Sequence, residues 1–447
     1  MLNGLASALP SAMRQQIRNR PLLRRLLGNS AWQLSDKVCR MGGAVLVGAY
    51  VARYLGPSEL GLLAYATALA TLVSAIAQFG MGSLVVRDLV ARPGDRPSIL
   101  ASAWLLRVGG GFAAMALSLA LSLLLRPGDG RSAVIVLLIA CMAVPQAWDV
   151  IDYDYQSRIE ARPVVVARNL SFLSLSAAKV LLVLLRAPLP CFALALSGET
   201  ALSAVLLARM WRKDGWKVPL FAVNWSELRQ LAAMSWPLVI AGLSTSVYMR
   251  IDQVMLGRML GNADVGLFAA AVRISEALYF LPMAVGASVA PALTAAHACS
   301  IPDYEQRFLK VTRLLVWAAI AVAICFTLFA RPIILGLYGA RFAGAAAVLS
   351  IHTWAGVLVS LGVCSNLWLI NEGHLKYTMY QTLLGAATNL ALNLFLIPRS
   401  GVTGAAFATC VGYFVAVTLT IAILPKARRL LHLQLASLVP LPLTRGP

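Results

Sequence analysis

The chain has 447 residues, of which 60% are hydrophobic and only 13% are charged, and its formal net charge is +20. Soluble domains carry about 25% charged residues, so this composition excludes a soluble enzyme, a disordered chain and a secreted disulfide scaffold. The surplus of Lys and Arg is typical of basic loops that face anionic lipid, and no nucleic-acid partner is expected.

Twelve apolar stretches follow one another along the chain, each close to the 20 or so residues that a helix needs to cross the hydrocarbon core. They lie at residues 33–53, 61–85, 100–125, 132–151, 164–185, 189–209, 233–256, 266–291, 311–330, 344–370, 377–397 and 402–424. The predicted fold class is therefore an all-α polytopic membrane protein with about twelve transmembrane helices.

The distribution of basic residues predicts the orientation of these helices. With the N-terminus placed inside, Lys and Arg are about three times as frequent in the inner segments as in the outer loops. Residues 1–32 are read as a basic cytoplasmic segment near the membrane surface rather than as a cleaved signal peptide. Residues 211–232 form a cytoplasmic linker and 425–447 a basic cytoplasmic tail, so both termini are predicted to be cytoplasmic.

An internal repeat divides the chain. Residues 53–66 (RYLGPSELGLLAYA) and 258–271 (RMLGNADVGLFAAA) are identical at seven of fourteen positions, at a constant offset of 205 residues. The alternative is a chance match between glycine-rich turns. If the repeat is real, residues 33–210 and 233–424 form two six-helix bundles in parallel orientation, with a cavity between them that suits alternating access.

The residues in and around the repeat resemble a known family. Its motifs are Asn29–Trp32 (NSAW), Ala52–Gly56 (ARYLG), Gly61, Phe79–Gly80, Arg87, Tyr248–Gly257 (YMRIDQVMLG), Gly261, Val265–Gly266, Ala269–Ala270 and Arg273–Glu276 (RISE). These are similar to Wzx-type O-antigen and exopolysaccharide transporters, in the MOP superfamily that also contains MATE drug exporters and the lipid II flippase. The resemblance implies translocation of a polyprenyl-pyrophosphate-linked oligosaccharide across the bacterial cytoplasmic (inner) membrane. It also implies membrane lipids and polysaccharide assembly proteins as partners.

Ionisable side chains at membrane depth are costly and usually face a cavity or a partner. The candidate substrate-binding residues are Arg40, Arg107, Lys179, Arg250 and Arg273. The candidates for coupling or gating are Asp252, Glu199, Glu276, Asp149 and Asp152. At membrane depth these five cations stand against only three of the acids, Glu199, Asp252 and Glu276, and this excess favours an anionic diphosphate cargo over a cationic drug.

Some of the charged candidates also have a structural interpretation. Arg273 and Glu276 have the i,i+3 spacing of an ion pair on one helix. Arg250 and Asp252 point in different directions on a helix, so both cannot face one cavity. Arg107 and Lys179 stand alone in apolar stretches, which makes them the strongest cavity-facing candidates.

Enzymatic alternatives rest on short motifs. Asp152 and Asp154 form a DxD pattern that would suit a membrane glycosyltransferase or an O-antigen polymerase, although Asp154 and Arg158 have the i,i+4 spacing of an ion pair. The seven cysteines form no CxxC pair, no histidine begins an HExxH motif, and no Walker A sequence occurs. We therefore expect a transporter and no enzyme, metal site or cofactor. A cation-coupled multidrug exporter of the same fold remains the main alternative.

Overall fold

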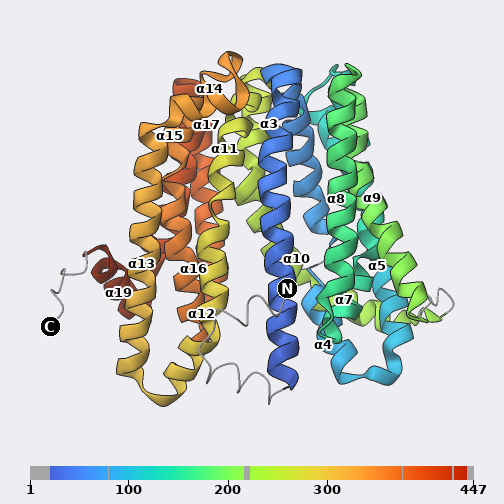
Figure 1. Ribbon diagram of the computed structural model, residues 1–447, viewed down its shortest axis with the longest axis vertical. Helices are drawn as coiled ribbons and strands as arrows, with labels where there is room; N and C mark the ends of the chain where they lie inside the picture. The colour runs from blue at the N-terminus through green and yellow to red at the C-terminus, as the bar shows by residue number, and fades with distance from the viewer. Residues whose placement is uncertain (1–20, 79, 216–221, 375, 425–426, 440–447) are drawn as a thin grey trace. The chain divides into compact units, whose positions relative to one another are not determined.

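The computed structural model describes residues 21–78, 80–215, 222–374, 376–424 and 427–439, and these ranges contain helices and no strands (Figure 1). The helices are α3 (Pro21–Ala77), α4 (Gly82–Ala91), α5 (Arg96–Leu125), α6 (Gly130–Ala140), α7 (Val150–Ser157), α8 (Ala161–Leu184), α9 (Leu189–Lys213), α10 (Trp225–Met259), α11 (Asn262–Ala277), α12 (Phe280–Cys299), α13 (Ile301–Leu328), α14 (Ala330–Tyr338), α15 (Ala345–His352), α16 (Ala355–Asn371), α17 (Lys376–Phe414), α18 (Thr420–Ile423) and α19 (Arg428–Leu438). Short 3₁₀ turns follow α4, α6 and α14. The all-helical class is as predicted.

The candidate spans are fewer and longer than the predicted stretches, but together they account for all twelve of them. Within the described ranges, nine stretches are long and apolar enough to cross a membrane, or ten if the bent pair Trp225–Trp236 and Leu238–Met259 is one span. The stretches Arg40–Ala91 and Lys376–Ile423 each contain two of the twelve predicted spans. Each is kinked at one glycine with positive φ, Gly56 (φ 72°) or Gly401 (φ 57°). Because glycine lacks a Cβ it adopts this conformation easily, so the helix resumes after a single residue and no loop separates the two spans.

The chain forms two compact units. Unit 1 comprises the described residues up to Ala44, Val73–Ala120 and Leu137–Val239, and unit 2 comprises Val45–Leu72, Leu121–Val136 and the described residues from Ile240 onward. Two segments of the predicted first bundle thus pack with residues of the predicted second bundle. The division into bundles at 33–210 and 233–424 stays a prediction.

The core of unit 1 brings α4, α5, α7 and α9 together. Buried side chains from these helices form one apolar cluster, which includes Val85, Ile99, Ile151 and Trp211. Burying each such side chain stabilises the fold by roughly 1.5–3 kcal/mol. This cluster packs together the helices α5, α7 and α9, which carry the candidate residues Arg107, Asp152 and Glu199.

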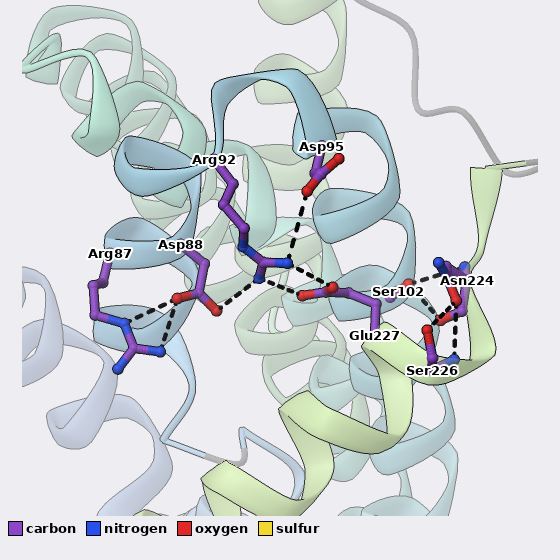
Figure 2. Close-up of polar contacts among 8 residues, drawn as sticks. All are labelled: Arg87, Asp88, Arg92, Asp95, Ser102, Asn224, Ser226 and Glu227. Atoms are coloured by element: carbon purple, nitrogen blue, oxygen red, sulfur yellow. Dashed lines mark hydrogen bonds and ion pairs between the residues drawn. The ribbon is translucent and has the colours of Figure 1, made fainter.

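An ion-pair network holds the start of α10 in unit 1 (Figure 2). Arg92 donates from both terminal nitrogens to the two carboxylate oxygens of Glu227, at 2.9 and 2.7 Å. Its guanidinium also lies 3.4 Å from Asp88. The Asn224 side chain accepts from the backbone N–H of Ser226 at 2.9 Å and so caps the helix start. The last part of the predicted linker at 211–232 is therefore helical, and the Arg92–Glu227 ion pair holds it against unit 1. Residues 216–221 lie outside the described ranges.

The two repeat copies pack against each other within unit 2. A Cβ on Gly61 would lie 1.6 Å from the carbonyl oxygen of Asn262, and a Cβ on Gly266 would lie 2.0 Å from the carbonyl oxygen of Pro57. Gly61 and Gly266 occupy equivalent positions in the repeat, and so do Pro57 and Asn262. The contact is thus reciprocal, as between related elements around a two-fold axis, and this reciprocity argues against a chance match of turns.

Arg126 reinforces this contact. Its guanidinium lies 3.9 Å from the centroid of the Tyr65 ring and donates to the side-chain oxygen of Asn262 at 2.7 Å. It also donates to the carbonyl oxygen of Gly257. A single side chain therefore bridges residues of both repeat copies inside unit 2.

The C-terminal helix α19 lies beside α13 in unit 2 (Figure 1). Arg313 donates to the carbonyl oxygen of Ala436 at 3.0 Å, and Gln434 donates to the hydroxyl of Ser365 at 2.7 Å. The predicted basic tail thus contains a docked helix. Residues 425–426 and 440–447 of that tail, and residues 1–20 of the predicted N-terminal segment, lie outside the described ranges.

Candidate functional site

One acidic side chain in unit 1 is shared by two cations. Glu199 of α9 lies 3.2 Å from the Lys179 ammonium of α8 and 3.4 Å from the Arg40 guanidinium of α3. The Lys179 and Glu199 side chains are only 13% and 18% exposed. Arg40 also lies 5.8 Å from the centroid of the Phe172 ring. Two positive groups against one carboxylate leave this cluster with a formal charge of +1 when all three are ionised.

Arg107 of α5 is almost fully buried, with 4% of its surface exposed. It donates to the carbonyl oxygen of Gln146 at 2.7 Å, to the Asp149 carboxylate at 3.1 Å and to the hydroxyl of Tyr153. A guanidinium offers five N–H donors in a fixed plane, which suits three acceptors on one neighbouring segment. Arg107 therefore fastens α5 to the segment that leads into α7.

A second guanidinium extends this polar cluster. Arg168 of α8 lies 2.8 Å from the Asp152 carboxylate and 3.9 Å from that of Asp149. Arg168 was not singled out from the sequence, although its position in the apolar stretch 164–185 was a usable indication.

The predicted isolation of Arg107 and Lys179 is wrong. Arg107 pairs with Asp149, 42 residues away, and Lys179 pairs with Glu199, 20 residues away. Helix packing brings partners together from distant parts of the chain, which spacing on a single helix does not reveal. The candidates for cargo contact or gating still include Arg107 and Lys179 with their acidic partners Asp149 and Glu199. Each of the two cations, however, is already in an ion pair in this structure.

The DxD motif does not present two free carboxylates. Asp154 is fully buried and accepts from Arg158 at 2.5 Å, from the Trp211 indole at 2.8 Å and from Arg96. Its i,i+4 pairing with Arg158 is therefore confirmed. The Asp152 carboxylate accepts a hydrogen bond from the Arg168 guanidinium. Within the described ranges no group of three or more His, Cys, Asp or Glu side chains is placed to hold a metal ion.

In unit 2 the pairing differs from the expected i,i+3 pair. Glu276 lies 3.4 Å from Arg250 of α10, and Arg273 forms no ion pair among the described residues. The Arg273 guanidinium instead lies against Gly48, where a Cβ would be 2.5 Å from its Nη1 atom. The structural pairing of Arg273 with Glu276 is thus wrong, because α10 supplies a partner that the sequence spacing does not show.

Asp252 of α10 is 3% exposed and is surrounded by neutral partners. Thr409 donates to one of its carboxylate oxygens at 2.6 Å, and Asn393 donates to the other. Asn393 also donates to the side-chain oxygen of Asn389 at 3.1 Å. In the described part of the chain no cation pairs with Asp252. A buried carboxylate among amide and hydroxyl oxygens can carry a proton or hold a hard monovalent cation, because either would offset the cost of a buried negative charge.

The fold and these charged helices define a polytopic membrane transport protein. A family model described as polysaccharide biosynthesis protein matches residues 26–297, and a second model, MatE, matches residues 237–395. Since the first match covers more than half of the sequence, the chain belongs to the polysaccharide biosynthesis protein family. The predicted family is thereby confirmed, and the expectation of a transporter instead of an enzyme agrees with it.

Individual proteins show the same relationship. The probable flippase AglR of Haloferax volcanii is 30% identical over 195 residues, which are 40% of this chain and 38% of that protein. The match thus spans less than half of the relative. The solved structure of the lipid II flippase MurJ in an inward closed conformation has a TM-score of 0.71 at 13% identity, over 92% of this chain and 91% of that one. An inward-facing MATE multidrug transporter of the MOP superfamily has a TM-score of 0.67 at 16% identity, over 91% and 95% of the chains. These structures confirm the predicted fold.

Proposed function

We propose that this protein is a flippase that moves a polyprenyl-diphosphate-linked oligosaccharide across a bacterial cytoplasmic membrane by alternating access. The cargo would serve O-antigen or exopolysaccharide synthesis. Family membership and the similarity to a probable flippase support this function. The supporting observation at the site is the cluster of Arg40, Lys179 and Glu199, in which one carboxylate serves two cations.

The excess positive charge determines which cargo this cluster favours. Phosphate oxygens can compete with Glu199 for the ammonium of Lys179 and the guanidinium of Arg40, because charge-assisted hydrogen bonds to phosphate are strong and guanidinium groups bind phosphate through two bonds. A cationic drug would be repelled by the same cluster. The multidrug exporter is the second candidate, supported by the MatE match at residues 237–395.

A leaflet-resolved transport assay in reconstituted vesicles separates the two candidates. The purified protein is tested with a lipid-linked oligosaccharide and, in parallel, with a cationic dye. We expect the glycolipid to change leaflet and the dye to stay where it is. Movement of the dye without movement of the glycolipid would establish the exporter instead.

Lys179→Gln should lower glycolipid transport by roughly 10–100-fold, because a hydrogen bond to a charged group contributes about 1.5–3 kcal/mol. The matched control is Lys310→Gln, which removes an exposed ammonium with no ion pair in the described structure. Glu199→Gln should have the opposite effect on binding and tighten the glycolipid, since it removes the competing carboxylate. Weaker glycolipid binding in Glu199→Gln would rule out this competition.

We further propose that Asp252 couples transport to an ion gradient. Asp252→Asn keeps the size of the side chain and removes the charge that a proton or sodium ion would neutralise. A tenfold proton or sodium gradient supplies about 1.4 kcal/mol per ion, so imposing it on wild-type vesicles should accelerate transport by up to about tenfold, and Asp252→Asn should not respond. Asp303→Asn, at a carboxylate of α13 whose side chain is 45% exposed and pairs with Arg307 on the same helix, serves as the control. A variant that responds like the wild type would show that Asp252 has no coupling role.

A further inference from the structure

A cavity of about 520 Å³ lies between α8 and α9 in unit 1, and the protein function proposed above does not involve it. Its wall is apolar on both helices and consists of Val166, Ala167, Leu170, Leu206 and Met210. Val166 and Leu170 are 37% and 51% exposed, so the cavity opens on the surface of the helices. Its volume lies within the range of about 300–1,000 Å³ that is typical of small-molecule sites.

Three basic residues close one end of this cavity, where α9 ends. Arg209, Arg212 and Lys213 line it, and all three are exposed. None of their side chains has an ion-pair or hydrogen-bond partner among the residues that the structure describes. By contrast, the guanidinium groups of Arg107 and Arg168 in the same unit are paired with carboxylates. The cavity therefore combines an apolar wall with unneutralised positive charge.

Two general effects favour basic residues at the end of α9. Cations in the last turn of a helix interact favourably with its dipole, and basic residues gather on the cytoplasmic side of membrane proteins. Neither effect requires a hollow apolar surface next to the charges. The hollow and the charges together match an amphiphile whose head is anionic and whose tail is apolar.

We propose that this cavity binds one anionic phospholipid of the inner leaflet. An acyl chain lies against Leu170 and Leu206, and the phosphate contacts Arg209, Arg212 and Lys213. The leaflet follows from the predicted cytoplasmic position of the α9 C-terminus. Val166 precedes Lys179 by thirteen residues of α8, which is about 20 Å along a helix axis. The lipid site is therefore separate from the cluster of Arg40, Lys179 and Glu199.

Native mass spectrometry of the delipidated full-length protein tests this site, with phosphatidylglycerol and phosphatidylcholine of identical acyl chains as probes. We expect one phosphatidylglycerol to bind more tightly than phosphatidylcholine. Removing all three charges in Arg209→Ala/Arg212→Ala/Lys213→Ala should weaken that binding on the order of fivefold for each charge. Leu170→Trp, which fills the cavity from its exposed side without changing any charge, should also abolish the tight binding.

The control variant Arg229→Ala/Lys310→Ala/Lys376→Ala removes the same charge from exposed residues that have no ion pairs in the described structure. An equal loss of phosphatidylglycerol in this control would reduce the effect to general attraction and overturn the site. Unchanged binding in Leu170→Trp, or equal affinity for the two phospholipids, would overturn it as well. Undecaprenyl phosphate that displaces phosphatidylglycerol with higher affinity would reassign the cavity to the polyprenyl carrier. The readout is lipid binding, so these outcomes do not depend on transport.

Discussion

Gly61→Ala should destabilise the protein by about 3 kcal/mol, the upper range for forcing an extra carbon into a packed interior. The new Cβ would lie 1.6 Å from the carbonyl oxygen of Asn262, which is backbone and cannot rotate away. Gly266→Ala should behave in the same way, because its Cβ would lie 2.0 Å from the carbonyl oxygen of Pro57. Thermal unfolding of the purified protein in detergent measures both effects.

Gly109→Ala is the matched control for these two variants. Gly109 lies in α5, and no atom lies within 4 Å of its added Cβ. This variant should be neutral or stabilising by up to about 1 kcal/mol, because glycine is a poor helix former. Identical unfolding of Gly61→Ala and Gly109→Ala would show that the contact between the repeat copies does not stabilise the protein. Because the two glycines share one contact, Gly61→Ala/Gly266→Ala should cost less than the sum of the single variants.

The second large effect is expected for Arg107→Ala. Removing one partner of a buried ion pair typically costs 3–5 kcal/mol, and here the Asp149 carboxylate, the Gln146 carbonyl and the Tyr153 hydroxyl all lose a donor. We expect about 3 kcal/mol, because Asp149 is partly exposed and Arg168 lies 3.9 Å from it. Thermal unfolding and the amount of protein in the membrane report this loss.

A double variant separates the structural role of Arg107 from a role in transport. Arg107→Ala/Asp149→Ala removes both charges and should recover a large part of the lost stability. If glycolipid transport stays absent in this stable double variant, Arg107 contributes to cargo movement. If stability and transport recover together, its role is structural. Arg107→Ala with unchanged unfolding and normal transport would contradict both interpretations.

The sequence predicted the class of fold because that class follows from local properties of the sequence, which can be read segment by segment. Apolar length and the loop distribution of Lys and Arg need no knowledge of contacts. The repeat was also visible, since Gly61 and Gly266 stand in matched surroundings. The sequence separated twelve stretches where the described part of the structure has ten candidate spans, because at Gly56 and Gly401 the helix kinks and resumes after a single residue.

The pairing of charges could not be predicted in the same way. Spacing on one helix suggests neighbours such as Arg273 and Glu276, but the structure pairs Glu276 with Arg250 on another helix. Glu199 was named as a candidate for coupling or gating, but its simultaneous contacts with Arg40 and Lys179 depend on three helices meeting. Asp154 and Arg158 were predicted correctly because both belong to one helix turn and its end. Tertiary partners decide which buried charges are available to a cargo.

The glycine contact between the repeat copies has a consequence for how such a chain originates. Each copy contains a glycine that leaves room for a backbone carbonyl of the other copy, and a carbonyl that packs against the other copy's glycine. A half-length ancestor with one copy would therefore possess the complete means of joining to a second molecule of itself. Gene duplication followed by fusion would then preserve a pre-existing homodimer interface within a single polypeptide.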